Sequence, residues 1–472
     1  MSFDFFLITP PTSSKCSPGS KANKRCPRGK ASRLRPMRVG VIGLGYLGVT
    51  HAVAMASLGH KVVGIEASAE RLGKLKEGEL PFFEPGLAAG LADAIAAGNL
   101  SFDAAASAAD DCDLYFLCVG TPQLSGSNAA DTSYVFAAGE ALAKVISEET
   151  VVVGKSTVPV GTAASLREKM SEIAGFDVKL AWNPEFLREG TALEDSLKPD
   201  RIVIGAWHQE SVAALRNCYE KIIAAGTAVI ETDVATSELV KVAANAFLAT
   251  KISFINAMAE VAEVAGADAV SLAEAIGYDD RIGKKFLRTG VGFGGGCLPK
   301  DIRGFVARAE ELGVGQAVSF LRDVDAINLR RRQRVLELAK EQLGDLEGRR
   351  VLVLGLAFKP DSDDMRDSPA LDVALGLASA GALVTVHDPV ALEALGDNHP
   401  QLERARDLES AFAGQELVVL ATEWQQYREL SPKAVASEVA SKTIIDARNV
   451  LDVPAWQAAG WKVIALGRNV HN

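Results

Sequence analysis

Residues 37–48, which read MRVGVIGLGYLG, decide the fold of this chain. They form a short apolar run that ends in glycine, and residues 46–58 predict a helix. A G-x-G-x-x-G pattern at such a strand-to-helix turn is typical of dinucleotide binding. Gly43 permits the tight turn, Gly45 lets the backbone approach a pyrophosphate, and Gly48 lets the helix lie close to the strand. We therefore expect a Rossmann-like domain to begin here.

The next predicted strand, residues 61–66, ends in an acidic side chain. Glu66 follows the glycine pattern near the roughly 20-residue spacing of the dinucleotide fingerprint. A carboxylate at this place accepts hydrogen bonds from an adenosine ribose and repels a 2′-phosphate, which favours NAD over NADP. Arg71 lies just downstream and could contact either cofactor. A purely structural glycine turn is the alternative.

Apolar runs and helical segments alternate along residues 37–231, which predicts a parallel sheet with helices on both faces. Residues 236–263 contain no Gly or Pro and predict one long helix, which opens a helical section to about residue 343. A second α/β unit begins at residue 349. The expected fold class is therefore α/β, with two doubly wound Rossmann-like domains joined by a long central helix and a helical spacer. The further predicted strands are residues 113–120, 150–156, 178–182, 201–205, 227–232, 349–355, 383–389, 416–422, 443–449 and 462–467.

The composition excludes several classes of function. The chain has 472 residues, of which 48% are hydrophobic and 23% charged, and its formal net charge is −10. This acidic balance argues against nucleic-acid binding. No uninterrupted apolar run approaches the ~18 residues of a membrane span, so neither nucleic acid nor a membrane is an expected partner. Residues 1–36 carry eight Lys or Arg against one Asp and predict a disordered extension.

The six cysteines indicate reduced thiols, which favours a cytoplasmic location. None forms a C-x-x-C pair or stands at zinc-ligand spacing from a His, so no metal site is expected. Cys297 differs from the others because it lies in the glycine-rich loop GVGFGGGCLPKD of residues 290–301, which would leave its thiol accessible. With Lys300 and Asp301 nearby it is a candidate nucleophile, since positive charge or a helix N-terminus lowers a thiol pKa. A small buried cysteine is the alternative.

Other polar side chains stand where a site is expected. Glu185 and Glu189 follow a predicted strand end and are candidates for acid–base chemistry. Lys241 and Asn245, at positions i and i+4 of the long helix, share one face among apolar neighbours. For each of these the alternative is a solvated surface. The second α/β unit lacks the glycine pattern, but two cations follow its first strand and could pair with phosphates: Lys359 and Arg366.

Eight motifs in order resemble those of the UDP-glucose/GDP-mannose dehydrogenase family, over about residues 37–467. They are GLGYLG, VGTP (residues 119–122), STVPVGT (156–162), NPEFLREG (183–190), ELVKVAANAF (238–247), RIGKKFL (281–287), GFGGGCLPKD (292–301) and FKPDSDDMRDSP (358–369). The resemblance implies that the chain oxidises the C6 alcohol of a nucleotide sugar to a carboxylate, with NAD as the acceptor of four electrons in total. UDP-glucose, giving UDP-glucuronate, is the expected substrate.

The resemblance also implies the catalytic roles. Cys297 would attack the C6 aldehyde to give a thiohemiacetal, which is oxidised to a thioester and hydrolysed. Lys241 and Asn245 would stabilise the oxyanions, and Asp301 would hold or activate water. The groups that would assist in the same site are Glu185, Glu189 and Thr121.

Binding roles follow from the same resemblance. The cofactor would contact Gly43, Gly45, Gly48, Glu66, Arg71, Thr121, Thr157 and Arg366. The UDP-sugar would contact Phe186, Leu187, Arg188, Lys241, Asn245, Arg281, Phe286, Lys359 and Arg448. Arg281 in such enzymes comes from the partner subunit, so a homodimer built on the long helix is implied.

The implied domains are a disordered extension (1–36), an NAD-binding Rossmann-like domain (37–231), a central helical domain with the dimer contact and the Cys loop (232–345), and a C-terminal UDP-sugar-binding Rossmann-like domain (346–472). Two positions depart from the family pattern: Glu66 stands where Asp is more usual, and Gly296 replaces a Ser. The alternatives are a GDP-mannose or other UDP-sugar 6-dehydrogenase, or, in another class, a noncatalytic nucleotide-sugar-binding protein.

Overall fold

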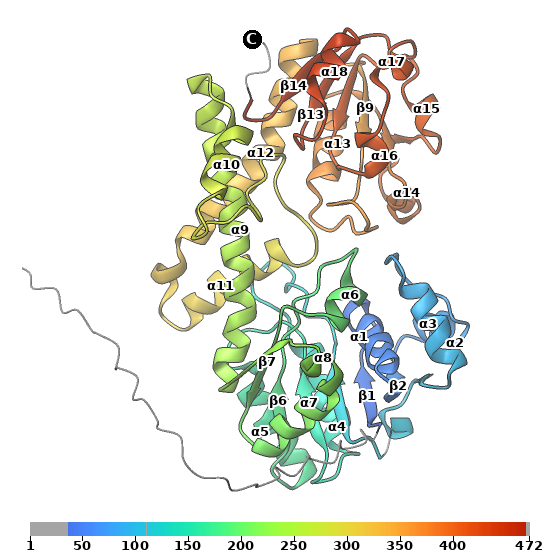
Figure 1. Cartoon of the computed structure of the whole chain (residues 1–472), viewed down its shortest axis with the longest axis vertical. Coiled ribbons are helices and arrows are strands. Elements are labelled where there is room, and N and C mark those ends of the chain that lie inside the picture. The colour runs from blue at the N-terminus through green and yellow to red at the C-terminus, as the bar shows by residue number, and fades with distance from the viewer. Residues whose placement is uncertain (1–35, 110, 469–472) are drawn as a thin grey trace, which may run out of the picture. The chain divides into compact units, whose positions relative to one another are not determined.

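An eight-stranded sheet carries the glycine turn at its centre (Figure 1). The computed structural model describes residues 36–109 and 111–468, and residues 36–472 group as one compact unit. The strand order is β3-β2-β1-β4-β5-β6-β7-β8. The order reverses between β1 and β4, and ligands of such sheets bind at the carboxyl ends of the strands beside this point. The strands are β1 (Arg38–Ile42), β2 (Lys61–Ile65), β3 (Leu100–Asp103), β4 (Leu114–Leu117), β5 (Val151–Gly154), β6 (Lys179–Trp182), β7 (Arg201–Ala206) and β8 (Ala228–Thr232).

Helices cover both faces of this sheet, as the apolar strand runs predict. One hydrophobic core joins the strands to α1, α3 and α7, and a second core on the other face joins them to α4 and α5. The helices are α1 (Tyr46–Ser57), α2 (Ala69–Lys76), α3 (Leu87–Ala96), α4 (Ser133–Ala143), α5 (Thr162–Ala174), α6 (Ala192–Leu197), α7 (Gln209–Cys218) and α8 (Glu220–Ala224), with a 3₁₀ turn at η1 (Ala106–Ala109).

The prediction of an entirely parallel sheet is wrong at one strand pair. β6 and β7 are antiparallel, with Trp182 opposite Gly205, whereas β7 and β8 are parallel to each other. A parallel connection returns the chain to the opposite edge of the sheet, usually through a helix. Here the connection of residues 183–200 includes one short helix, α6, and does not cross back along the sheet. The chain therefore enters β7 at the same end of the sheet at which it left β6.

The central section is helical, and the predicted long helix is confirmed as α9 (Val234–Ala265). α9 contacts α10, α11, α12 and the edge of the first sheet at β7. The other elements of this section are α10 (Ala269–Gly277), α11 (Leu298–Glu311), η2 (Gly315–Val318) and α12 (Phe320–Leu343). By length and composition α9 could cross a membrane, a test that core helices also pass, and 44% of its most apolar window is buried.

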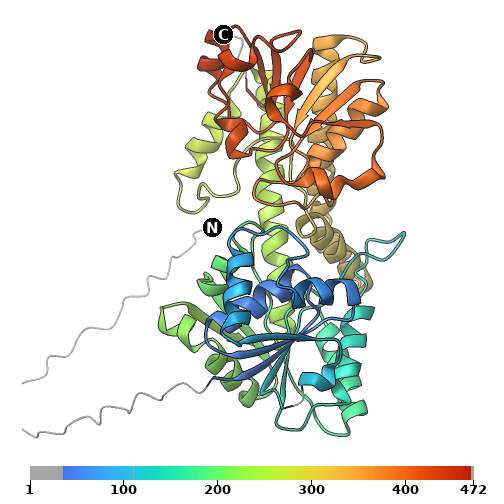
Figure 2. The ribbon, with the colours of Figure 1, turned by 90° about the vertical axis from the view of Figure 1, so that its right-hand side faces the viewer.

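The second α/β unit contains a six-stranded sheet in the order β11-β10-β9-β12-β13-β14, and all its pairs are parallel (Figure 2). The fold class, two Rossmann-like domains with a long central helix, is thus confirmed. The strands are β9 (Arg350–Leu354), β10 (Leu383–His387), β11 (Leu402–Arg404), β12 (Leu417–Leu420), β13 (Thr443–Asp446) and β14 (Lys462–Ala465). The helices are α13 (Pro369–Ser379), α14 (Ala391–Leu395), η3 (Gly396–Asn398), α15 (Leu408–Ala411), α16 (Gln425–Arg428), α17 (Pro432–Val435) and α18 (Val453–Ala458).

Two strands escape the sequence prediction, and both lie at a sheet edge. β3 and β11 have four and three residues, and outward-facing Ser, Glu and Arg interrupt their apolar pattern. Edge strands pair on one side only, so a short polar segment can occupy them. The predicted extension of residues 1–36 lies, up to Arg35, outside the described residues, and the four-part domain division stays a prediction.

Candidate active site

The glycine turn between β1 and α1 has the geometry that a dinucleotide requires. Gly43 has φ +88°, in the left-handed region, and a Cβ on Gly48 would lie 1.9 Å from the Gly43 carbonyl oxygen. A Cβ on Gly45 would meet nothing within 4 Å, so the backbone there faces open space. The N-terminus of α1 opens onto this space without a side-chain cap. The turn therefore fits a pyrophosphate.

Glu66 lies beside this turn and is buried. Its carboxylate accepts hydrogen bonds from the backbone N–H of Leu44 at 3.0 Å and of Ser68 at 2.8 Å. Arg71 pairs with it at 3.1 Å. The ion pair draws Arg71 towards the carboxylate, so the guanidinium is not free to attract a 2′-phosphate. The residues present fit NAD.

A cavity of about 950 Å³ lies between the first sheet, α9, the glycine-rich loop and the second α/β unit. Its wall includes most of the predicted catalytic and sugar-binding residues: Cys297, Lys241, Asn245, Glu185, Glu189, Phe186, Leu187, Arg188, Phe286, Lys359 and Arg448. Segments far apart in the sequence thus meet around one space. Its size suits a nucleotide sugar, since ligand pockets of roughly 300–1,000 Å³ are usual.

Cys297 caps the N-terminus of α11 and is exposed to the cavity. The surrounding protein and the Glu185 carboxylate raise the pKa of its thiol to about 12, against the opposing effect of Lys241. The lowered pKa suggested by the neighbouring lysine and the helix terminus is therefore wrong for the chain alone. Lys300 instead pairs with Asp301 at 2.7 Å. Cys297 is a protonated thiol at rest.

The glycines of the Cys297 loop allow close packing against the segment of residues 358–369. A Cβ on Gly294 would lie 2.2 Å from the Asp367 carbonyl oxygen, and one on Gly295 would lie 2.8 Å from the Phe358 ring. A Cβ on Gly296 would lie 2.4 Å from the guanidinium carbon of Arg366. The departure to Gly296 thus leaves room for the Arg366 side chain where a serine would have to displace it.

Lys241 and Asn245 present their polar groups from one face of α9. The buried Lys241 ammonium pairs with Glu185 at 2.9 Å. Burial lowers the pKa of Lys241, but Glu185, Cys297 and Asp301 together raise it above its ordinary value, so the side chain is charged. Asn245 donates a hydrogen bond to Asp301 at 2.7 Å. Asp301 is buried behind Asn245 and does not border the cavity.

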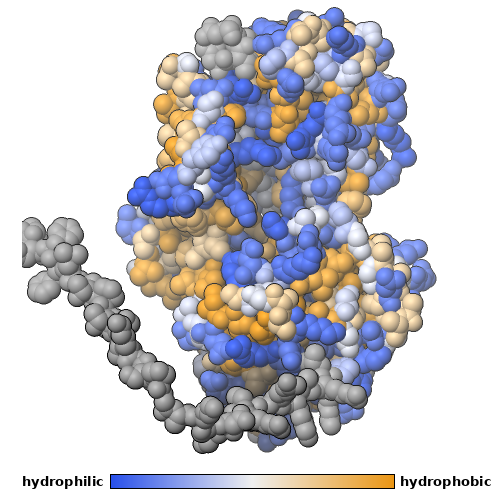
Figure 3. Space-filling model, viewed as in Figure 1, coloured by the Kyte–Doolittle hydropathy of each residue, from blue (hydrophilic) through white to orange (hydrophobic). Residues whose placement is uncertain are grey.

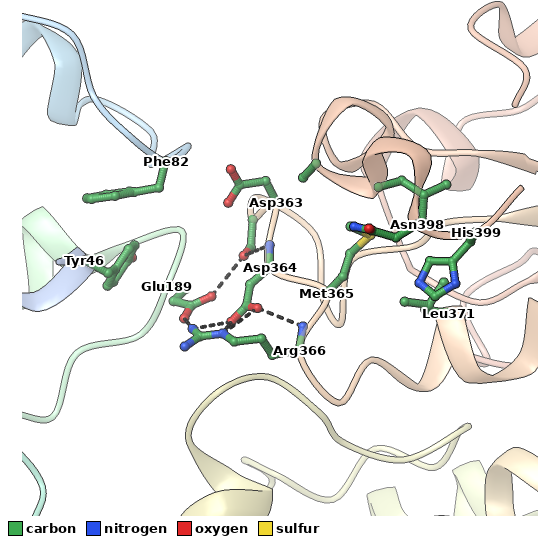
Figure 4. A pocket seen from close by; sticks show the side chains of 13 residues that line it. Tyr46, Phe82, Glu189, Asp363, Asp364, Met365, Arg366, Leu371, Asn398 and His399 are labelled. Carbon is green, nitrogen blue, oxygen red and sulfur yellow. Dashed lines mark hydrogen bonds and ion pairs between the residues drawn. The ribbon is translucent and has the colours of Figure 1, made fainter. Parts of the chain in front are cut away.

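Glu189 borders both this cavity and a second pocket of about 430 Å³ that reaches Tyr46 of the glycine turn (Figure 4). Burial, and then the charge of Asp364, raise the pKa of Glu189 to about 7, while a hydrogen bond from Ser362 at 2.9 Å lowers it. Arg366 lies 3.6 Å from the Glu189 carboxylate. Glu189 therefore stands where a proton can be held or released near neutral pH.

Several cations at the cavity are already engaged by the chain. Arg448 donates to the carbonyl oxygens of Ala421, Gly292 and Phe358 at 2.6, 2.9 and 3.1 Å. Lys359 donates to the Glu189 carbonyl oxygen at 2.6 Å, and Arg188 pairs with Asp195 at 2.5 Å. Phe186 lies under the guanidinium of Arg201, 3.7 Å from the ring centroid.

Of the predicted catalytic and sugar-binding residues, Asp301, Thr121 and Arg281 do not border the cavity. Thr121 donates a hydrogen bond to the Thr157 carbonyl oxygen at 2.7 Å, at the carboxyl ends of β4 and β5. Arg281 is 89% exposed and pairs with Asp279 outside the cavity. Within the described ranges, no cluster of three or more His, Cys, Asp or Glu could hold a metal ion.

The sequence analysis missed two anchors of the NPEFLREG loop. The buried Glu84 accepts hydrogen bonds from the backbone N–H of Gly190 at 2.7 Å and of Ala192 at 2.8 Å, and from the Tyr46 hydroxyl. Lys155 is buried at the other end of this loop and donates to Asn183 at 3.1 Å. A lysine at the end of an apolar strand run was the one signal in the sequence; nothing local marks Glu84.

Comparison with known proteins gives the family of each part of the chain. Three models of the UDP-glucose/GDP-mannose dehydrogenase family match: the NAD binding domain at residues 37–223, the central domain at 235–330 and the UDP binding domain at 352–453. The cofactor is NAD, as the glycine turn and Glu66 predict.

Relatives and solved structures agree with these matches. The UDP-glucose 6-dehydrogenase of Rhizobium meliloti (strain 1021) is 39% identical over 92% of this chain and 100% of its own length. The structure of a UDP-glucose dehydrogenase from Pyrobaculum islandicum is 38% identical and covers 95% of this chain and 99% of its own, with a TM-score of 0.84. A UDP-D-ManNAc dehydrogenase from Pyrococcus horikoshii is 26% identical, with coverage of 92% and 99% and a TM-score of 0.80. Matches of this extent, over residues that line one cavity, show that the chain belongs to the UDP-glucose/GDP-mannose dehydrogenase family.

Proposed function

We propose that this protein is a UDP-glucose 6-dehydrogenase, which oxidises the C6 alcohol of UDP-glucose to the carboxylate of UDP-glucuronate. The observation that carries the proposal is the cavity in which Cys297, Lys241 and Asn245 share one wall. The relatives named UDP-glucose 6-dehydrogenase support the choice of sugar. A nucleophile beside oxyanion donors is what a covalent oxidation of an aldehyde requires.

NAD, when bound at the glycine turn, would accept one hydride from C6, with one NAD molecule for each of the two oxidations. The hydroxyl proton lost with each hydride would pass to Glu189, which borders the cavity. Between the two oxidations, the Cys297 sulfur adds to the C6 aldehyde. A thiol with a pKa of about 12 is protonated at neutral pH, so the proton must leave as the S–C bond forms. Lys241 is charged and can donate a proton to the aldehyde oxygen, and the thiol proton then replaces it. The product is a neutral thiohemiacetal on Cys297.

The second oxidation leaves a thioester on Cys297, and hydrolysis breaks its S–C bond. Water adds to C6, and the oxyanion of this tetrahedral state faces the Lys241 ammonium and the Asn245 amide. The sulfur leaves as the thiol with one proton of the water, and the carboxylate is released as the other proton passes to solvent. Asp301 holds the Asn245 amide at 2.7 Å, which orients it towards the oxyanion. A role of Asp301 in activating water stays a prediction.

Binding of the UDP group is assigned to the second α/β unit and the loops that face it. Lys359 and Arg448 border the cavity from this unit, and Phe286 borders it from the central section. Burial lowers the pKa of Lys359, whereas Glu189 raises it. A diphosphate beside Lys359 would favour its charged form, so substrate binding and the charge of this lysine support each other.

The protein is further proposed to be a cytoplasmic homodimer joined along α9. This helix exposes Phe247, Phe254 and Val261 at 67%, 49% and 59% of their surfaces. A spacing of seven residues places them on one face, and Figure 3 shows apolar patches on the side where α9 to α12 lie. The partner proposed for this face is a second copy of the chain. The Arg281 of that copy could then reach the cavity, which this chain's own Arg281 does not border. Replacement of Phe254 by Glu should yield monomers in light-scattering measurements.

The decisive experiment is turnover of purified protein with NAD and a panel of UDP- and GDP-sugars. UDP-glucose should give UDP-glucuronate, identified by mass, with two molecules of NADH per sugar and no free aldehyde. Preference for GDP-mannose or another UDP-sugar would select the alternative dehydrogenase. Binding of UDP-sugars without turnover would select the noncatalytic alternative.

A further inference from the structure

A buried polar cluster lies behind the catalytic face of the cavity and plays no part in the reaction proposed above. Its members are His51 of α1, Lys155 after β5, Asn183 after β6 and Tyr219 after α7, all of which border the cavity. Lys155 is only 8% exposed. Its contacts are the Asn183 carboxamide oxygen at 3.1 Å, the Tyr219 hydroxyl at 3.5 Å and the rings of Phe116 and Tyr219.

A buried ammonium with this environment is costly. Within the described part of the chain, no carboxylate lies within ion-pair distance of Lys155, and burial of a charge without such a partner destabilises a fold. An apolar side chain would fill the same place at lower cost. The lysine therefore needs an explanation other than packing.

The group that Lys155 holds is the first residue of the NPEFLREG loop. The Asn183 carboxamide donates to the Val203 carbonyl oxygen at 2.7 Å, and its oxygen accepts from Lys155 and from the Tyr219 hydroxyl at 2.8 Å. The Asn183 backbone N–H donates to the Gly154 carbonyl oxygen at 2.8 Å. Asn183 is thus fixed from β5, β7 and the residue after α7.

Two residues later the same loop presents Glu185 to the site. One carboxylate oxygen of Glu185 accepts from the Lys241 ammonium at 2.9 Å, and the other accepts from the Leu187 N–H at 2.5 Å. Pro184 has a restricted φ, so an anchored Asn183 limits where Glu185 can lie. Displacement of Glu185 would move the ammonium that faces the C6 oxygen.

We propose that Lys155 is a positioning residue: it fixes Asn183, and through Asn183 it sets the place of Glu185 and Lys241. The inference rests on the proposed function of Lys241. The titratable or charged groups that face Lys155 are His51, Cys118, Glu185, Cys218, Tyr219 and Lys241. Burial lowers the pKa of Lys155, whereas Cys118 and Glu185, the one carboxylate among these groups, oppose that shift.

The test measures kcat and KM for Lys155→Met and Tyr219→Phe. Each variant removes one donor to the Asn183 oxygen. We expect Lys155→Met to lower kcat by about tenfold or more and Tyr219→Phe by about threefold, with both KM values within about twofold of wild type. Lys155→Arg, which keeps charge and donors, should recover part of kcat.

The matched control is Tyr427→Phe. Tyr427 is equally buried, in the second α/β unit, and donates to the His387 carbonyl oxygen at 2.9 Å. Its loss should lower the melting temperature and leave kcat unchanged. If Lys155→Met does not fold, the kcat of Tyr219→Phe is compared with that of Tyr427→Phe, and this comparison tests the inference. An unchanged kcat in Tyr219→Phe and in any folded Lys155→Met would overturn the inference. Glu185→Gln separates the positioning role of Lys155 from the role of the Glu185–Lys241 pair. Full activity of Glu185→Gln would overturn the role of the pair itself.

Discussion

The resting state of Cys297 makes a prediction about its reactivity. With a thiol pKa of about 12, the thiolate fraction at pH 8 is about 10⁻⁴, against about 0.24 for a free cysteine of pKa about 8.5. A more basic thiolate is also a better nucleophile, by about 25- to 55-fold over this difference for a Brønsted coefficient of 0.4–0.5. The chain without ligands should therefore react with iodoacetamide about 40- to 100-fold more slowly at Cys297 than free cysteine does.

Two substitutions should change this rate in opposite directions. Among the charged groups, Glu185 has the largest effect that raises the thiol pKa, and Lys241 has the largest effect that lowers it. Glu185→Gln should therefore speed alkylation of Cys297, and Lys241→Met should slow it. If the helix N-terminus alone controlled the thiol pKa, neither substitution would change the alkylation rate, because both variants keep Cys297 at the start of α11.

The assay follows alkylation of the Cys297 peptide by mass spectrometry from pH 7 to pH 10. Cys112, Cys118 and Cys218 are buried, and burial raises their pKa values to about 11, 12 and 12, so they should stay unmodified in the folded chain. Unfolded protein, in which every cysteine reacts, gives the reference. Alkylation of Cys297 at the rate of free cysteine, or slowed by Glu185→Gln, would refute the electrostatic reasoning.

Four further predictions follow from the cofactor turn, the carboxylates, the thiol and the first residues. Glu66→Gln should narrow the preference for NAD over NADP in kcat/KM, because the carboxylate no longer repels a 2′-phosphate; an unchanged ratio would remove Glu66 from cofactor choice. The pKa of Glu189, about 7, lies above its ordinary value of 4.5, so the folded chain binds more protons than the unfolded chain between these pH values and its stability falls as pH rises through them. Glu189→Gln should flatten this dependence in denaturant titrations at pH 5 and pH 8. Cys297→Ala should abolish formation of UDP-glucuronate while NAD and UDP-glucose still bind, and near wild-type carboxylate production would exclude the thioester route. A chain that starts at Met37 should keep the kcat and melting temperature of the full chain, unless residues 1–36 are part of the fold.

The sequence predicts most of the fold because parallel strands buried on both faces have an uninterrupted apolar pattern. That pattern locates β1, β2 and β4 to β8 in the first sheet to within a few residues. It carries no information on strand direction, so the antiparallel entry of β7 could not be predicted. The direction depends on where the connection of residues 183–200 ends, and the contacts of this connection with Glu84 and Lys155 are with residues far from it in the sequence.

Some features of the site depend on residues that are neighbours in the sequence, and others depend on residues far apart in it. The glycine turn is local, since Gly43, Gly45 and Gly48 each answer a steric demand within a few residues of the chain. The glycines around Cys297 could be explained as access for a ligand, but three of them face backbone or side chains of residues 358–369, which no local pattern shows. The electrostatics are the least local part. Lys300 lies three residues after Cys297 but pairs with Asp301. Burial, and then the Glu185 carboxylate of the NPEFLREG loop, raise the thiol pKa. The charge that the chemistry needs therefore comes from Lys241 on α9, and its place depends in turn on Glu185 and the groups that anchor Asn183.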